Sequence, residues 1–213
     1  MQQLKQLYRA NYTGEEITVN LRWEGSDWHH QREFIPNRIT NSQVSKHAVI
    51  VGNGDSRKIF DINLLKNHRG YAFGAGAVQT YGCNATYRDC ETTFQVVTGR
   101  EMADEIANSG YCDDHIVYAN SQHIQNYPGK FYLMPQDPSY NAGALATYLA
   151  CFDGHEFVYL MGFDCNAGEG YNNNIYADTA CYAPRLSGYS DIPWVRNQTH
   201  VMETYPQIGR AHV

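Results

Sequence analysis

The chain has 213 residues, of which 43% are hydrophobic and 18% charged, enough for one globular domain with a full core. A net charge of −6 without a cluster of Lys or Arg argues against a nucleic-acid partner, and no apolar run approaches the roughly 18 residues of a membrane span. The six cysteines form no C-x-x-C pair and no signal-peptide core opens the chain, which predicts a cytoplasmic protein with reduced thiols; the oligomeric state stays open.

Residues 1–46 form a polar segment that we interpret as an N-terminal extension. Apolar and polar residues alternate over Glu16–Trp23, which predicts a half-buried strand. A turn at Glu24–Asp27 is followed by a second candidate strand at Trp28–Ile35. The sequence therefore predicts a small β-hairpin outside the main sheet.

From residue 47 onward, short apolar strands alternate with helical patterns. We expect strands at 47–51, 71–73, 92–97, 115–119, 130–134 and 156–161, and helices at 60–67, 99–109, 139–152 and 192–205, with a helical turn at 120–126. Ser139 is the expected N-cap of the helix at 139–152, which has the clearest helical pattern. This alternation predicts an α/β fold with a doubly wound, mostly parallel, Rossmann-like sheet over residues 47–207.

The last residues, 208–213, match the translation of a common sequencing-library adapter. We therefore interpret them as a non-native tail and expect a final strand of the natural protein beyond about residue 207.

The turn after the first strand of the main sheet, residues 52–57, is the first candidate for a ligand site. Gly52 and Gly54 permit a sharp turn, and we expect a helix from near Lys58 whose free N–H groups favour an anion. Arg57 stands where the dinucleotide fingerprint G-x-G-x-x-G has its third glycine, so that fingerprint is absent. An ordinary strand-to-helix turn is the alternative.

Polar residues beside glycines recur in four loops that we expect at the carboxyl edge of the predicted sheet. They are residues 52–56, 82–89, 136–143 and 162–166, and their candidate ligands are Gly52, Asn53, Gly54, Ser56, Asn84, Ser139, Asn141, Gly143 and Asp164. Each residue alone is an ordinary cap or turn residue, but in a parallel sheet all four loops meet at one edge. Amides and hydroxyls there predict a nucleotide-binding site.

Three segments also resemble a known family. V-I-V-G-N-G-D-S, ending at Ser56, resembles a motif of the bacterial sialyltransferases of glycosyltransferase family 42 and of related motility-accessory and pterin-diphosphokinase-like proteins. G-C-N-A-T-Y-R-D, ending at Asp89, resembles their Cys-Asn motif, and Tyr140–Asp164 their helix–strand module. The chain is also similar to predicted proteins of marine phages, which would place it in a host cytoplasm.

The resemblance implies a glycosyltransferase whose donor is a sugar linked to cytidine monophosphate (CMP) and whose acceptor is a glycan, with no cofactor. Asn53 and Asn84 would hold the phosphate and ribose, Asn141 and Gly143 would lie near cytidine, and Asp164 would flank the donor. Tyr176, or alternatively Tyr171, would stabilise the leaving phosphate, and the absence of a D-x-D motif implies a metal-independent enzyme.

Two departures from the family pattern keep other functions open. Asp55 replaces the family proline, and His200, the candidate general base, falls inside the last predicted helix. The alternatives are a pterin-diphosphokinase-like enzyme that uses ATP and a non-catalytic phage structural or interaction protein with the same fold.

Overall fold

The structure is a computed structural model. It describes residues 3–9, 15–24, 27–36, 45–66, 78–124, 126–127, 130–136, 138–164, 171–187, 190–206 and 209–212. The predicted strand at 71–73 lies outside these ranges.

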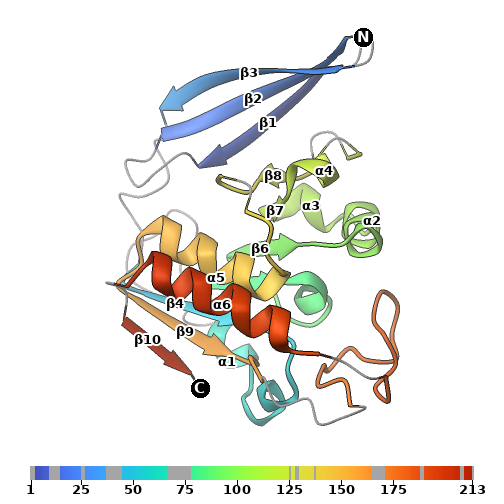
Figure 1. The fold of residues 1–213 in the computed structure, drawn as a ribbon, viewed down its shortest axis with the longest axis vertical. Coiled ribbons are helices and arrows are strands. Elements are labelled where there is room, and N and C mark those ends of the chain that lie inside the picture. Colours follow the sequence, from blue (N-terminus) through green and yellow to red (C-terminus); the bar gives the residue numbers. More distant parts are fainter. Residues whose placement is uncertain are drawn as a thin grey trace.

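A seven-stranded sheet forms the centre of the molecule (Figure 1). Its order is β10-β9-β4-β5-β6-β7-β8, and every neighbouring pair is parallel. The bounds are β4 His47–Val51, β5 Gln79–Cys83, β6 Phe94–Val97, β7 Val117–Ala119, β8 Tyr132–Leu133, β9 Phe157–Met161 and β10 Gly209–His212. The predicted α/β fold with a mostly parallel sheet is confirmed.

Strand β4 is covered on both faces, as its unbroken apolar sequence requires. Ala48 and Ile50 pack into the largest core cluster, which includes most of the long helix α5. Val49 and Val51 point to the opposite face and pack into a separate cluster with Met161. Because neighbouring strand residues face opposite ways, these two clusters show that the sheet is doubly wound.

The helices differ from the expected ones mainly at their ends. They are α1 Asn63–Lys66, α2 Arg100–Asn108, α3 Tyr111–Asp114, α4 Ser121–Ile124, α5 Ala142–Asp153 and α6 Ile192–Thr204, with 3₁₀ helices η1 Asp55–Ile59 and η2 Asn84–Arg88. The helix expected from near Lys58 is wrong, because η1 already begins at Asp55. Helices α5 and α6 lie together on one face of the sheet (Figure 1).

Strand β5 was not expected from the sequence, although it lies directly beside β4. Its residues Q-T-Y-G-C lack an apolar run, yet all five are buried. Its polar groups have partners: the Thr80 hydroxyl accepts from the Thr93 N–H at 2.9 Å, and the Gln79 N–H donates to Ser45 Oγ at 3.3 Å. Such pairing allows a polar side chain such as that of Thr80 in a central strand.

The N-terminal segment forms a three-stranded antiparallel sheet instead of the expected hairpin. Strands β2 (Glu15–Glu24) and β3 (Asp27–Pro36) correspond to the predicted pair, and β1 (Gln3–Arg9) adds to β2. At the other end of the chain, β10 pairs with β9 inside the segment interpreted as a tail. The interpretation of residues 208–213 as a non-native tail stays a prediction.

The chain runs from β4 outward to β8 and then returns to the other side of β4 as β9. The strand order therefore reverses between β4 and β9, and open α/β sheets bind ligands at the carboxyl ends of such strands. No helix in the described ranges has both the length and the apolar character needed to cross a bilayer. The described cysteines are free thiols.

Candidate functional site

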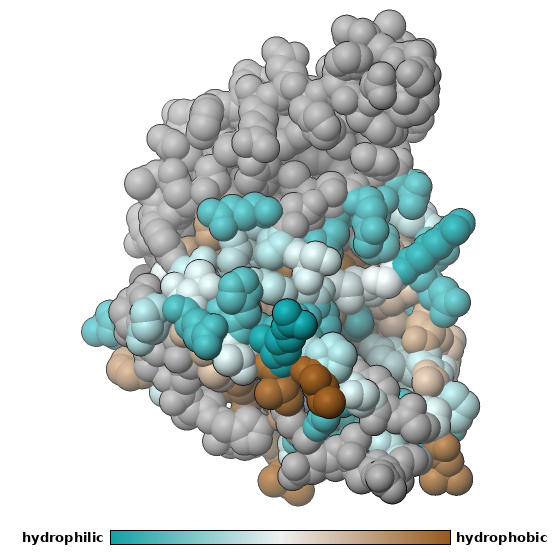
Figure 2. Space-filling model, viewed as in Figure 1, coloured by the Kyte–Doolittle hydropathy of each residue, from teal (hydrophilic) through white to brown (hydrophobic). Residues whose placement is uncertain are grey.

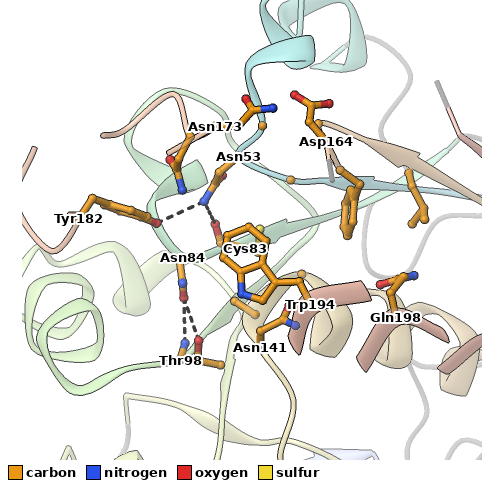
Figure 3. Close-up of a pocket in the computed structure, with 18 of the residues that line it drawn as sticks. Asn53, Cys83, Asn84, Thr98, Asn141, Asp164, Asn173, Tyr182, Trp194 and Gln198 are labelled. Atoms are coloured by element: carbon orange, nitrogen blue, oxygen red, sulfur yellow. Dashed lines mark hydrogen bonds between the residues drawn. The ribbon is translucent and has the colours of Figure 1, made fainter. Parts of the chain in front are cut away.

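A cavity of about 440 Å³ opens where β4, β5 and β9 end, at the reversal of the strand order. Its polar lining is mainly amide (Figure 3). The lining residues are Gly52, Asn53, Gly54, Cys83, Asn84, Thr98, Asn141, Ala142, Gly143, Leu160, Gly162, Phe163, Asp164, Asn173, Asn174, Tyr182, Trp194, Gln198 and Met202. The structure thus brings Asn53, Asn84 and Asn141, from three separate loops, to one hollow, as the sequence predicts.

The N–H groups of the first turn are mostly occupied by the protein itself. The Asp55 N–H donates to Asn173 Oδ1 at 2.9 Å, and the Ser56 N–H donates to Asp164 Oδ2 at 2.7 Å. The Ser56 hydroxyl also donates to Asp164. Asp164 therefore caps η1, and the expected anion site on the N–H groups at the start of this helix is not open. Among the described residues, the Asn53 N–H has no protein acceptor.

Arg57 is buried below this turn and joins three loops. Its guanidinium donates to Gly52 O at 3.0 Å, to Asp89 Oδ2 at 2.9 Å and to the Tyr176 hydroxyl at 2.8 Å. The Tyr176 hydroxyl donates in turn to Asp89. Burial raises the pKa of Tyr176, and the hydrogen bond to Asp89 adds to this effect. Both partners of Tyr176 are protein groups, and it does not line the cavity.

The Asn53 amide is engaged on both sides. Its Nδ2 donates to Cys83 O at 3.3 Å and to the Tyr182 hydroxyl at 3.2 Å, while Oδ1 accepts from Thr86 Oγ1 at 3.0 Å. Tyr182 also accepts from the Ala85 N–H at 3.2 Å. Its hydroxyl proton is therefore left for a ligand, and burial raises the pKa of Tyr182, so the hydroxyl stays protonated. Burial likewise raises the pKa of Cys83 to about 11, which keeps this thiol unreactive.

Three asparagine amides share another arrangement, in which the oxygen is held and the nitrogen is not. Asn84 Oδ1 accepts from the Thr98 N–H at 2.9 Å, and Asn173 Oδ1 accepts from the Asp55 N–H at 2.9 Å. Asn141 Oδ1 accepts from the Ala144 N–H at 3.0 Å. Within the described part of the chain, none of the three Nδ2 groups has a protein acceptor, and Asn141 Nδ2 is buried. All three residues line the cavity and offer it an NH₂ group.

Asn141 is also the N-cap of α5, which corrects the expected N-cap, Ser139. The helix begins at Ala142 because the Asn141 side chain, and not that of Ser139, reaches the free N–H of Ala144. Ser139 is exposed and does not line the cavity. The adjacent Gly143 leaves room for Phe163: a Cβ atom at Gly143 would lie 3.1 Å from its ring.

Helix α6 supplies the opposite wall. Trp194, Gln198 and Met202 recur every four residues and so share one helix face, which lines the cavity (Figure 3). Gln198 lies 3.3 Å from the Thr147 hydroxyl of α5, and its Nε2 is buried without a partner among the described residues. Apolar surface from Phe163 and Leu160 completes this side.

Several predicted site residues lie elsewhere. His200, the expected general base, is on the exposed face of α6, where its Nδ1 lies 2.6 Å from the Tyr140 hydroxyl. Tyr171, the alternative to Tyr176, donates to Asp55 Oδ2 at 2.9 Å near the surface. Ser56 supports Asp164 but does not line the cavity. The catalytic roles of His200 and Tyr171 and the ligand-binding role of Ser56 stay predictions.

The sequence analysis missed Asn173, Asn174, Tyr182 and the α6 wall. The spacing of Trp194, Gln198 and Met202 was a visible signal, because residues four apart share a helix face. Asn173, Asn174 and Tyr182 lie in a segment without helix or strand, where no periodic pattern of the sequence indicates which way a side chain points.

Asp164 is the one charged side chain among the described residues that line the cavity. Its charge is partly compensated by the two hydrogen bonds from Ser56. The described ranges contain no group of three or more His, Cys, Asp or Glu residues that suits a metal ion. The site therefore offers a ligand mainly neutral donors and apolar surface.

No family model and no curated protein matches the sequence. Among solved structures, the fold matches a crystal structure of a variant of the sialyltransferase CST-II in complex with CMP, with 13% identity and a TM-score of 0.47. The match covers 78% of this chain and 81% of that chain. A likeness of this size does not identify an activity.

Proposed function

We propose that the cavity binds a nucleotide-sugar, CMP-linked or closely related, and that the protein is a metal-independent glycosyltransferase acting on a glycan acceptor. The observation that carries the proposal is the set of oriented amides. Asn84, Asn141 and Asn173 each present an NH₂ group to one cavity while a backbone N–H holds the oxygen. Phosphate, ribose and base oxygens are the acceptors that such a set requires.

Neutral donors suit the proposed reaction. The leaving nucleotide gains negative charge as the bond to the sugar breaks, and preoriented donors stabilise that charge without reorganisation. In this proposal the Asn53 N–H and the NH₂ groups of Asn84 and Asn173 contact the phosphate. The Tyr182 hydroxyl takes the role that the sequence analysis gave to Tyr176, because Tyr182 lines the cavity. Asp164 flanks the donor.

Calorimetric titration with CMP tests the binding claim. The Asn141→Asp variant keeps an N-cap acceptor but replaces the NH₂ donor with an oxygen, so it separates folding from binding. We expect heat of binding for the unmodified protein and a loss of about tenfold or more in affinity for the variant, which corresponds to about 1.4 kcal/mol. Asn108→Asp, the same change on the exposed surface of α2, is the matched control. No heat with CMP, CDP or UMP would overturn the proposal.

A non-catalytic nucleotide-binding protein is the second candidate. It is favoured by the position of His200, which is exposed and bonded to Tyr140 instead of lining the cavity. Incubation with CMP-linked sugars distinguishes the two candidates: release of CMP and transfer of sugar to a glycan support the enzyme. Nucleotide binding without release supports the second candidate.

A further inference from the structure

Helices α5 and α6 each bring one amide with an incomplete set of hydrogen bonds to the cavity. Asn141 Nδ2 and Gln198 Nε2 are both buried and have no partner among the described residues. Both residues line the cavity (Figure 3). An unpaired buried amide is unfavourable, so these two atoms mark places where a ligand completes the bonding.

The orientation of the Asn141 amide is fixed. Its Oδ1 accepts from the Ala144 N–H at 3.0 Å, which is the N-cap bond of α5. Exchanging oxygen and nitrogen would place an NH₂ group against that N–H, which is unfavourable. Asn141 therefore acts toward a ligand as a donor only.

The orientation of the Gln198 amide is reversible. Thr147 Oγ1 lies 3.0 Å from Gly143 O and 3.3 Å from Gln198 Oε1, but a hydroxyl has a single hydrogen to donate. When Thr147 donates to Gly143, its lone pair can accept from Gln198 after the amide rotates by half a turn. Oε1 then becomes the unpaired atom. The oxygen and nitrogen of an amide occupy nearly the same volume, so both orientations fit.

We propose that Asn141 and Gln198 together read the hydrogen-bonding edge of a pyrimidine base, an inference that rests on the proposed function. Cytosine and uracil share the O2 acceptor, which the fixed donor of Asn141 matches. They differ at position 4, which is an amino donor in cytosine and a carbonyl acceptor in uracil. Gln198 serves both bases, because it accepts in one orientation and donates in the other.

Two further features of the α6 wall agree with a flat base. Trp194 precedes Gln198 by one turn on the same face and also lines the cavity, so an aromatic surface accompanies the amide. Base stacking on aromatic side chains tolerates either pyrimidine. Thr147 is the positioning residue, because it holds the Gln198 side chain from α5.

The test measures the ratio of the CMP and UMP affinities by calorimetry. We expect the unmodified protein to bind both nucleotides within about tenfold of each other, since one neutral hydrogen bond separates them. Gln198→Glu leaves only acceptors and is expected to shift the ratio about tenfold toward CMP, whereas Gln198→Lys leaves only donors and shifts it toward UMP. CMP and UMP carry the same phosphate, so the general attraction or repulsion between an added charge and the phosphate does not change the ratio of the two affinities. Asn197→Asp, an adjacent change on α6 outside the cavity lining, is the control.

The outcomes separate the two proposals. If the protein binds both nucleotides and neither Gln198 variant changes the ratio, base reading by Gln198 is wrong while the proposed function stands. If it binds neither, the proposed function fails and the base-reading pair fails with it. Circular dichroism establishes whether each variant folds. If Gln198→Lys does not fold, the ratio of the CMP and UMP affinities of Gln198→Glu alone decides whether Gln198 reads the base.

Discussion

Amide side chains form most of the polar lining of the candidate site. Their hydrogen bonds distinguish the amides that hold loops in place from those that can bind a ligand. Asn53 is bonded through both ends of its amide, so its side chain ties loops together. Within the part of the chain that the structure describes, Asn84 and Asn173 are bonded through oxygen alone, and their nitrogens are available to a ligand. Identical side chains thus have different roles, because the backbone groups around them differ.

Tyr176 and Tyr182 give a prediction at this scale. Tyr176→Phe removes a buried hydroxyl between Arg57 and Asp89, so we expect the free energy of unfolding to fall by about 1–3 kcal/mol. We expect its CMP affinity to stay within about twofold, since Tyr176 does not line the cavity. Tyr182→Phe is expected to weaken CMP binding by about tenfold. Urea unfolding and calorimetry measure both effects, and the reverse pattern would assign the leaving phosphate to Tyr176.

At the scale of elements, the site is held by short helices that follow the strands. η1 begins at Asp55, after the turn that follows β4, and Asp164 caps it by accepting from the N–H of Ser56, 108 residues earlier in the chain. η2 follows β5 and is joined to α2 by Arg88, whose guanidinium donates to Glu105 at 2.6 Å and 2.8 Å. These contacts fix the loops that carry Asn53 and Asn84.

The Arg88–Glu105 pair predicts a pH dependence of stability. The hydrogen bond from Arg88 lowers the pKa of Glu105 from 4.5 to about 2, so folding favours the ionised carboxylate. The stabilisation is complete above about pH 5 and is lost as the pH falls through 4.5 toward 2. We expect Glu105→Gln to cost about 1 kcal/mol at pH 7, because both side chains are partly exposed, and to flatten the loss of stability below pH 5.

Urea unfolding at several pH values between 3 and 7 checks this expectation. Glu101→Gln, on the exposed surface of the same helix, is the control for removing a carboxylate from α2. Parallel curves for Glu105→Gln and the unmodified protein would show that the pair contributes nothing to the acid response.

At the scale of the whole molecule, the cavity results from the reversal of strand order between β4 and β9. The described residues that line it lie between 52 and 202, and the described core residues of the main sheet begin at Ala48. Among the described strands, those of the N-terminal sheet pair only with one another, and β1 contacts β8, the edge strand of the main sheet farthest from β9. Figure 2 shows the mixed polar and apolar surface of the described main domain.

A chain that begins at Ser45 should therefore fold and bind CMP as the full chain does. Ser45 is kept because its hydroxyl accepts from the Gln79 N–H. We expect one cooperative unfolding transition and an affinity within about twofold of the full chain, because no ligand contact is removed. Loss of the cooperative transition would show that residues 1–44 belong to the same folding unit.

The sequence by itself determined the fold class and the residues that meet at the site's edge. An apolar run with β-branched residues predicts a buried parallel strand, and β4 is one. Because parallel strands end at the same edge, the sequence placed the loops of Asn53, Asn84 and Asn141 at one edge of the sheet, although β5, the strand before Asn84, was not itself predicted. Local patterns suffice for an apolar strand such as β4 but not for β5, whose polar residues gave no sign of its burial.

Only the tertiary structure decided which side chains face a ligand. Ser139 and Asn141 are both acceptable N-caps by sequence, and the position of the Ala144 N–H selects Asn141. The open N–H groups expected in the first turn are occupied by Asn173 and Asp164, which lie more than 100 residues away. Such partners are fixed by the packing of distant segments, so no local pattern reveals whether a polar group is already paired or still free to bind.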